Sequence, residues 1–133
     1  MKWVTHISLA AALLLALTAK AGATIHDISV GNFFFSPANT VVNVGDTVRW
    51  TFVSGTHSST SDGFSLKSWD SGVQTSGTFQ IVILPADGPG PFPYHCSVHP
   101  VTMKDTIFVD PTNDADSDGI PDISDNCPFD ANA

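Results

Sequence analysis

One short stretch of the chain carries three side chains that could hold a transition metal. It runs from Tyr94 to Met103 and includes Cys96 and His99. Two imidazoles and a thiolate with a weak axial thioether suit a copper ion that exchanges single electrons. The second imidazole is available upstream, at His57. The candidate copper ligands are therefore His57, Cys96, His99 and Met103.

Zinc is the chemical rival of copper at such a set, because it also binds cysteine and histidine. Structural zinc sites usually take several cysteines and rarely a thioether, so Met103 favours copper. A purple two-copper centre would need a second cysteine in the ligand loop, and Ser97 and Val98 supply none. Four protein ligands leave no open position for a substrate, so we expect a carrier and not an enzyme.

Two other histidines are interpreted as structural or surface residues. His95 adjoins Cys96, but alternation along a strand directs it to the opposite face. We expect His95 to pack or to lie at the surface. His26 lies near the expected start of the mature chain, and we expect it to be solvated.

A second cluster of ligand atoms lies near the C-terminus. Oxygen ligands occupy positions 1, 3, 5, 9 and 12 of a loop that starts at Asp114, and Gly119 takes the sixth position, where the sharp turn requires glycine. Ile120 could offer its carbonyl at the seventh. The candidate calcium ligands are Asp114, Asp116, Asp118, Ile120, Asp122 and Asp125. Prolines flanking and within the loop exclude EF-hand helices, and without calcium we expect an extended acidic segment.

The elements that must position these residues are predicted to be short strands. Apolar residues recur at every second position in Val48–Phe52 and in Thr78–Leu84, and further strands are expected at Ile25–Val30, Val41–Val44 and Thr106–Val109. The mature chain shows no helical apolar periodicity, so we predict an all-β sandwich or barrel. Gly45-Asp46 indicates a hairpin between its flanking strands. The Pro/Gly-rich stretch Asp87–Pro93 is expected to be a surface turn.

The first 23 residues have the pattern of a removable signal peptide. Lys2 precedes an apolar run from Ile7 to Ala19, which is too short to span a bilayer. We expect cleavage before Thr24, with Ala19-Lys20-Ala21 as a competing site. The protein is then exported, to a periplasm or outside the cell, and no later segment is apolar enough to cross a membrane.

The negative charge of the chain is concentrated at its end. The whole chain carries a formal net charge of −8, and seven of its 13 acidic residues lie from Asp110 onward. Such a surface makes nucleic acid an improbable partner. An exported chain with two cysteines can form one disulfide, but a copper role for Cys96 leaves Cys127 unpaired within the chain.

The residues around the candidate copper ligands resemble those of the plastocyanin/cupredoxin family. The resemblance covers residues 24–110, and the segments that carry it come in the family's order: Phe34-Phe35-Ser36-Pro37, Val41–Trp50, Thr56-His57, Trp69-Asp70-Ser71-Gly72 and Tyr94–Met103. It implies a Greek-key β-sandwich of seven or eight strands with one type 1 (blue) copper, which passes electrons between redox protein partners. It also implies that His99 exposes its edge through an apolar patch, for which Pro100 and Val101 are candidates. Members of the family differ in the length of the loop from His99 to Met103.

The acidic segment at residues 111–133 resembles a thrombospondin type 3 repeat. The string that carries the resemblance is Asp-x-Asp-x-Asp-Gly-x-x-Asp-x-x-Asp-Asn-Cys-Pro, from Asp114 to Pro128. In that family the repeats occur in arrays, wrap calcium and join their neighbours through cysteines. The resemblance implies a short, irregular calcium-binding tail.

Two other functions are compatible with these residues. A copper storage or delivery protein would use the same ligands but would release copper on reduction. An extracellular calcium-dependent interaction module would use the tail as its functional part, with copper incidental. The behaviour of copper on reduction distinguishes the first alternative, and intense visible absorption from a Cys–Cu(II) bond weighs against the second.

Overall fold

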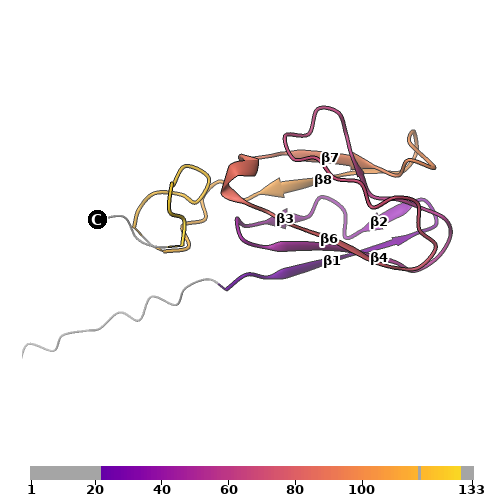
Figure 1. Cartoon of the computed structure of the whole chain (residues 1–133), viewed down its shortest axis with the longest axis horizontal. Helices are drawn as coiled ribbons and strands as arrows, with labels where there is room; N and C mark the ends of the chain where they lie inside the picture. The colour runs from indigo at the N-terminus through magenta and orange to yellow at the C-terminus, as the bar shows by residue number, and fades with distance from the viewer. Residues whose placement is uncertain (1–21, 117, 130–133) are drawn as a thin grey trace, which may run out of the picture.

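The computed structural model describes residues 22–116 and 118–129, so most of the predicted signal peptide lies outside the described residues (Figure 1). The described chain contains strands and one short 3-10 turn, without an α-helix. Its elements are β1 (Ile25–Gly31), β2 (Phe34–Ser36), β3 (Val41–Val42), β4 (Thr47–Phe52), β5 (Thr60–Ser61), β6 (Gly77–Val82), η1 (Pro85–Asp87), β7 (Phe92–His95) and β8 (Lys104–Val109).

The strands form two four-stranded sheets that pack face to face. One sheet has the order β2-β1-β4-β6 and the other β3-β8-β7-β5. Each is mixed, because β1 pairs parallel with β4 and β3 pairs parallel with β8, whereas the remaining pairs are antiparallel. The predicted all-β sandwich is confirmed.

The hairpin predicted at Gly45-Asp46 is wrong. β3 and β4, which flank this turn, belong to different sheets. The Gly45 N–H donates to the Ile83 carbonyl at 2.8 Å, and the Ile83 N–H donates to the Asp46 carbonyl at 2.9 Å. The turn is thus bonded to the chain just after β6 and carries it from one sheet to the other. A Gly-Asp pair between alternating strands specifies a reversal, but not which strands will pair.

Other predicted boundaries differ less. β6 and β8 fall within about two residues of the predicted strands at each end. The predicted surface turn at Asp87–Pro93 is wrong at its end, because Phe92 and Pro93 begin β7. Pro93 has no N–H to donate, yet its carbonyl accepts the Asp62 N–H at 2.9 Å. A proline is tolerated there because it lies at the start of a strand.

An aromatic cluster fills the space between the sheets. The alternation in β4 directs Val48, Trp50 and Phe52 inward, and all three are buried. The Trp50 ring lies 5.5 Å from the rings of both Trp69 and Tyr94. Such contacts add to the large hydrophobic stabilisation that each buried ring supplies. This core provides a rigid base for the loops at both ends of the sandwich.

The C-terminal segment packs against one end of the sandwich, opposite the loop that connects β7 and β8 (Figure 1). Ile123 packs against the hydrophobic core, and Ala115 is buried. A side-chain carbon placed at Gly45 would lie only 2.7 Å from the Phe129 ring, so the ring covers the turn at that residue. The segment is therefore compact, in contrast to the extended chain expected from its carboxylates. Its apolar side chains and internal hydrogen bonds offset the repulsion among those charges.

Candidate metal centre

The loop between β7 and β8 carries three of the four candidate copper ligands. The Cys96 N–H donates to the Met103 carbonyl at 3.0 Å, which closes the base of the loop. Within it, the His99 N–H donates to the Cys96 carbonyl and the Met103 N–H donates to the His99 carbonyl, both at 3.0 Å. These bonds fold eight residues so that His99 and Met103 return toward Cys96. Cys96 and Met103 are buried, at 0% and 1% exposed.

His57 reaches the same place from the segment after β4. Its backbone exchanges two hydrogen bonds with Gln74, of 3.0 and 2.7 Å, which hold this segment against the strand connection. Gly55 lies just before it with a φ of +78°. A side-chain carbon at Gly55 would lie 2.5 Å from the His57 Nε2. Glycine therefore serves twice here, since it permits the left-handed backbone and leaves space for the imidazole ring.

The candidate nitrogen and sulfur atoms converge at distances suited to one metal ion. The His57 Nδ1 lies 3.7 Å from the Cys96 Sγ, and the His99 Nδ1 lies 3.6 Å from it. All three ligand atoms lie within 4.8 Å of one another. An ion about 2.0 Å from nitrogen and about 2.3 Å from sulfur, with trigonal angles, would separate those atoms by about 3.7 Å. The donor set and its spacing therefore fit a single first-row metal ion.

The surroundings of His57 favour the protonation state that a metal needs. Burial lowers the pKa of His57, and the nearby His99 lowers it further. The neutral imidazole is thereby favoured, and it can offer the Nδ1 lone pair. On the other side, the Ser58 N–H donates to the Cys96 Sγ at 3.4 Å. A hydrogen bond of this kind to a ligand sulfur tunes the reduction potential of a metal bound to it.

Ser58 also joins the two ligand-bearing segments, a role that we did not predict. Its Oγ accepts the Ser97 N–H at 2.8 Å and lies 2.8 Å from the Ser97 Oγ. Ser58 follows His57 in the chain, and Ser97 follows Cys96. The signal available in the sequence was that two of the four candidate ligands, His57 and Cys96, are followed directly by a serine. Such a repeat becomes informative only once the two segments are known to be adjacent.

Exposed apolar side chains surround His99. The Phe33 ring meets the His99 ring edge-on, with 4.6 Å between centroids. Phe33 is 59% exposed and adopts a φ of +62°, which is unusual for a bulky residue. We call the apolar patch the set Phe33, Val98, Pro100 and Val101, all of which are exposed. Phe33 was not predicted, because nothing local in Phe33-Phe34-Phe35 marks it as a neighbour of His99.

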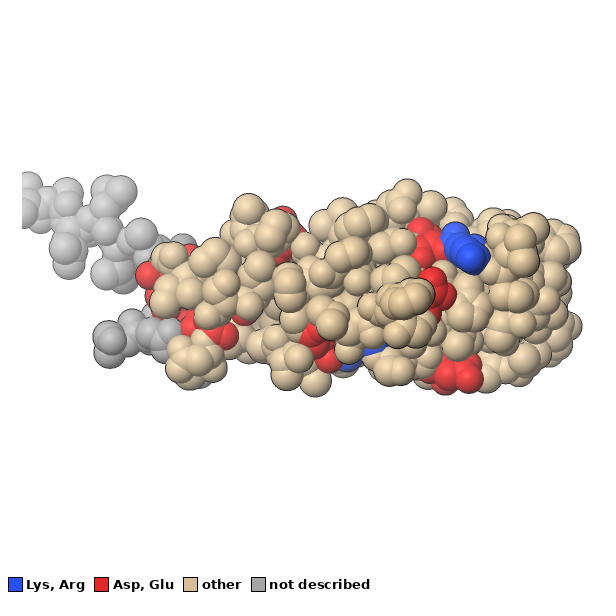
Figure 2. All heavy atoms as spheres, turned by 90° about the horizontal axis from the view of Figure 1, so that it is seen from above, with Lys and Arg blue, Asp and Glu red and all other residues tan. Residues whose placement is uncertain are grey.

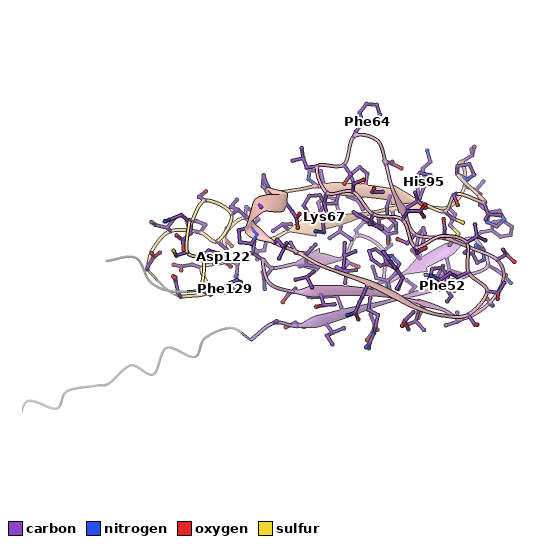
Figure 3. The ribbon with its side chains drawn as sticks, viewed as in Figure 1. Phe52, Phe64, Lys67, His95, Asp122 and Phe129 are labelled. Carbon is purple, nitrogen blue, oxygen red and sulfur yellow. The ribbon has the colours of Figure 1, made fainter. Side chains whose placement is uncertain are left out.

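The two remaining histidines of the described residues pair with carboxylates. His95, labelled in Figure 3, lies beside Thr60 of β5 and pairs with Asp62, and its side chain is partly exposed. His26 does not lie free in solvent as expected. Its Nε2 lies 2.7 Å from the Asp46 Oδ2, and the Asp46 side chain is almost fully buried. A carboxylate buried at this turn needs hydrogen-bond donors, and His26 is one of them.

The acidic tail brings three of its candidate ligands together. One carboxylate oxygen from each of Asp114, Asp116 and Asp118 lies within 4.8 Å of the others. The Gly119 N–H donates to the Asp114 Oδ2 at 2.9 Å, and Gly119 has a φ of +95°, which favours glycine. Among the described residues, the Asp114 Oδ1 and the Asp116 Oδ2 are buried without a hydrogen-bond partner. Burial raises the pKa of Asp116, and repulsion from neighbouring carboxylates raises it further.

The other candidate calcium ligands do not belong to this cluster. Asp122 is buried at 1% exposed and accepts the Ala115 N–H at 2.8 Å, while its other oxygen contacts the Asn113 amide. Asp125 accepts the Cys127 N–H at 2.9 Å. Ile120 lies at the exposed surface after Gly119. In the described segment, Asp122 thus supports the backbone of the loop that presents the three clustered carboxylates, whereas Asp125 bonds within its own turn.

Comparison with known proteins agrees with both parts of the chain. The family model of the thrombospondin type 3 repeat matches residues 112–133. A purple cupredoxin from Nitrosopumilus maritimus is 28% identical with a TM-score of 0.53, and the match covers 63% of this chain and 98% of that one. A mutant plastocyanin of fern, solved oxidized and reduced, is 24% identical with a TM-score of 0.53, over 64% and 100% of the two chains.

A third similar structure belongs to an enzyme. The copper-containing nitrite reductase from Thermus scotoductus SA-01 is 21% identical with a TM-score of 0.53, over 67% of this chain but only 22% of that one. No curated protein sequence matches the chain. The sandwich therefore has the cupredoxin fold and a group of two His and one Cys at one end. No helix in the described part of the chain is long and apolar enough to cross a bilayer.

Proposed function

We propose that this protein is an exported type 1 copper protein that carries single electrons between redox protein partners. The observation that carries the proposal is the convergence of the His57 Nδ1, the Cys96 Sγ and the Nδ1 of the partly exposed His99 at one end of a cupredoxin sandwich, with His57 and Cys96 buried. When bound, copper supplies reversible one-electron chemistry. His57, Cys96 and His99 would hold it, with Met103 as the weak axial ligand.

The protein contributes rigidity and access. The backbone bonds of the Cys96–Met103 loop and the pairing of His57 with Gln74 fix the ligands before any metal arrives. A site that is already formed changes little between two oxidation states, which suits electron transfer. The apolar patch around His99 offers a surface on which a partner can dock without displacing charged groups. Four protein ligands leave no position for a substrate, which supports a carrier over an enzyme.

The C-terminal segment is proposed to bind calcium. The match to the thrombospondin type 3 repeat and the convergence of three carboxylates in one loop support this role. Asp114, Asp116 and Asp118 would be the first ligands, and the Ile120 carbonyl is the candidate at the seventh position. In this proposal, Asp122, whose two carboxylate oxygens both accept hydrogen bonds, reaches the ion only if those bonds rearrange, and Asp125 remains a candidate ligand.

The test is to load the chain from Thr24 with Cu(II) and record its visible and electron-spin spectra. We expect an intense thiolate-to-copper band with an unusually narrow copper hyperfine splitting. Cyclic voltammetry should then show a reversible one-electron couple with copper retained. Loss of copper on reduction would instead support storage or delivery. A colourless Cu(II) complex would remove the type 1 assignment.

A further inference from the structure

A chain of three hydroxyl groups leads from the metal site to a surface carboxylate. The Ser97 Oγ lies 2.8 Å from the Ser58 Oγ, which lies 2.9 Å from the Thr60 Oγ1. The Thr60 Oγ1 then donates to the Asp70 Oδ1 at 3.0 Å. Ser58 is fully buried, whereas Asp70 is exposed. The chain thus runs from beside Cys96 to solvent, and none of its members is a candidate metal ligand.

The chemistry of the end group fixes the direction of every bond in this chain. A carboxylate can only accept, and each hydroxyl has a single proton to donate. Thr60 gives its proton to Asp70, so it must accept from Ser58. Ser58 gives its proton to Thr60, so it must accept from the Ser97 hydroxyl. Both lone pairs of the Ser58 Oγ are then used, one by the Ser97 hydroxyl and one by the Ser97 N–H at 2.8 Å.

This direction determines what Ser58 can do for the metal site. With its own proton committed to Thr60, Ser58 becomes a fixed double acceptor for Ser97, the residue after Cys96. Its backbone N–H meanwhile donates to the Cys96 Sγ. Without an acceptor at position 70, the three protons could reverse. Ser58 could then donate to the Ser97 hydroxyl, and the hydrogen bond that its Oγ accepts from the Ser97 N–H would weaken.

We propose that Asp70 is a positioning residue for the metal site: by accepting from Thr60 it sets the direction of the Thr60–Ser58–Ser97 chain and so holds the His57 and Cys96 segments together. The inference rests on the proposed copper function for its significance. It does not depend on that function for its geometry. Asp70 has a second fixed contact, since the same Oδ1 accepts the Gly72 N–H at 2.9 Å.

The test compares two matched pairs of variants. Thr60→Val interrupts the chain with little change of shape, and Thr60→Ser retains the hydroxyl. Asp70→Ala removes the terminal acceptor, and Asp70→Asn retains an acceptor oxygen while removing the charge. In the metal-free protein, amide hydrogen exchange of Ser97 should be about fivefold faster in Thr60→Val and Asp70→Ala, the change that corresponds to about one net hydrogen bond. Thr60→Ser and Asp70→Asn should exchange as the parent chain does.

The copper-loaded protein supplies a second readout. A weaker N–H···S bond leaves more charge on the thiolate and favours Cu(II), so Thr60→Val should lower the reduction potential. Loss of a negative charge alone would raise the potential, so the sign separates the two effects, and Asp70→Asn should not lower it. Equal exchange rates in Thr60→Val and Thr60→Ser would overturn the proposal, as would identical behaviour of Asp70→Asn and Asp70→Ala. If the parent chain failed to form a blue centre, the proposed function would fall, while the exchange rates in the metal-free protein would still decide the role of Asp70.

Discussion

The candidate copper site is a buried thiol flanked by two imidazole nitrogens. Each of these side chains can be replaced separately to test its role. The Cys96 Sγ is approached by His57, by His99 and by the Ser58 N–H. The sulfur therefore has polar neighbours on several sides although the residue is fully buried. The types of these residues were predicted from the sequence. Their distances, and the part played by Ser58, required the structure.

Cys96→Ser should abolish the intense visible band while the sandwich remains folded. The band arises from charge transfer from thiolate to copper, and a hydroxyl does not supply it. The small change in volume should cost little stability, because the hydroxyl can keep the Ser58 N–H as a donor. Visible absorption and far-ultraviolet circular dichroism of the Cu(II)-loaded variant measure the two effects. An intense band in the variant would show that the ligand assignment is wrong.

Met103→Leu should retain copper and colour but raise the reduction potential. Replacing the thioether with an apolar group removes a weak donor, and Cu(II) loses more from this than Cu(I) does. The exchange nearly conserves volume at a fully buried site, so stability should fall by less than about 1.5 kcal/mol. Voltammetry of the two proteins measures the shift. An unchanged potential would place Met103 outside the coordination sphere.

The metal-free protein should lose stability in acid, partly because of His57. Its pKa is lowered in the folded state, so the unfolded chain binds the proton more tightly. The destabilising contribution is absent well above the unfolded pKa of about 6.5 and grows as the pH falls below it. Thermal melts at pH 8 and pH 5.5 measure this effect. In His57→Gln the drop between the two pH values should be smaller, and an equal drop would assign the acid sensitivity to other groups.

At the scale of strands and loops, the sequence predicted where strands lie and which of their faces is buried, but not which strands pair with each other. Alternation at Val48, Trp50 and Phe52 predicted β4 and its buried face correctly. The hairpin at Gly45-Asp46 failed, because the choice between neighbouring and opposite sheets depends on contacts far apart in the chain. The same limit explains why Phe33 was missed. Its contact with His99 joins residues that are distant in sequence, and no local signal marks them as neighbours.

The turn at residues 121–125 links the acidic loop, with its proposed calcium site, to the sandwich. Its Ile123 packs against the hydrophobic core, while Asp122 holds the backbone of the loop at Ala115. Ile123→Ala should therefore lower the stability of the sandwich by about 1–2 kcal/mol, less than at a fully buried position. It should also weaken calcium binding, although Ile123 is no ligand. Melting curves and calcium titrations of the variant measure both effects, and unchanged calcium affinity would show that the two parts are independent.

At the scale of the whole molecule, the candidate copper and calcium sites lie at opposite ends of one sandwich (Figure 1). We expect calcium at micromolar to millimolar levels to protect the tail from proteolysis. Because the tail packs on the core, calcium should also raise the melting temperature. At a hundredfold excess over its dissociation constant, calcium should add about 2.7 kcal/mol to the free energy of unfolding. The copper spectrum should not change. Equal proteolysis with calcium and with chelator would leave a plain acidic tail.

The separation of the two ends also gives the molecule an electrical polarity. Seven of its acidic residues lie from Asp110 onward, and on the face shown in Figure 2 the end beyond the basic spheres, opposite the tail, carries no charged side chain. The long axis therefore bears a dipole moment whose negative pole is the tail. Near an acidic surface, this dipole experiences a torque that turns the end opposite the tail, with its apolar patch, toward that surface. A collision with an acidic partner would thus be oriented before contact, more strongly at low salt and less strongly if bound calcium neutralised part of the negative pole.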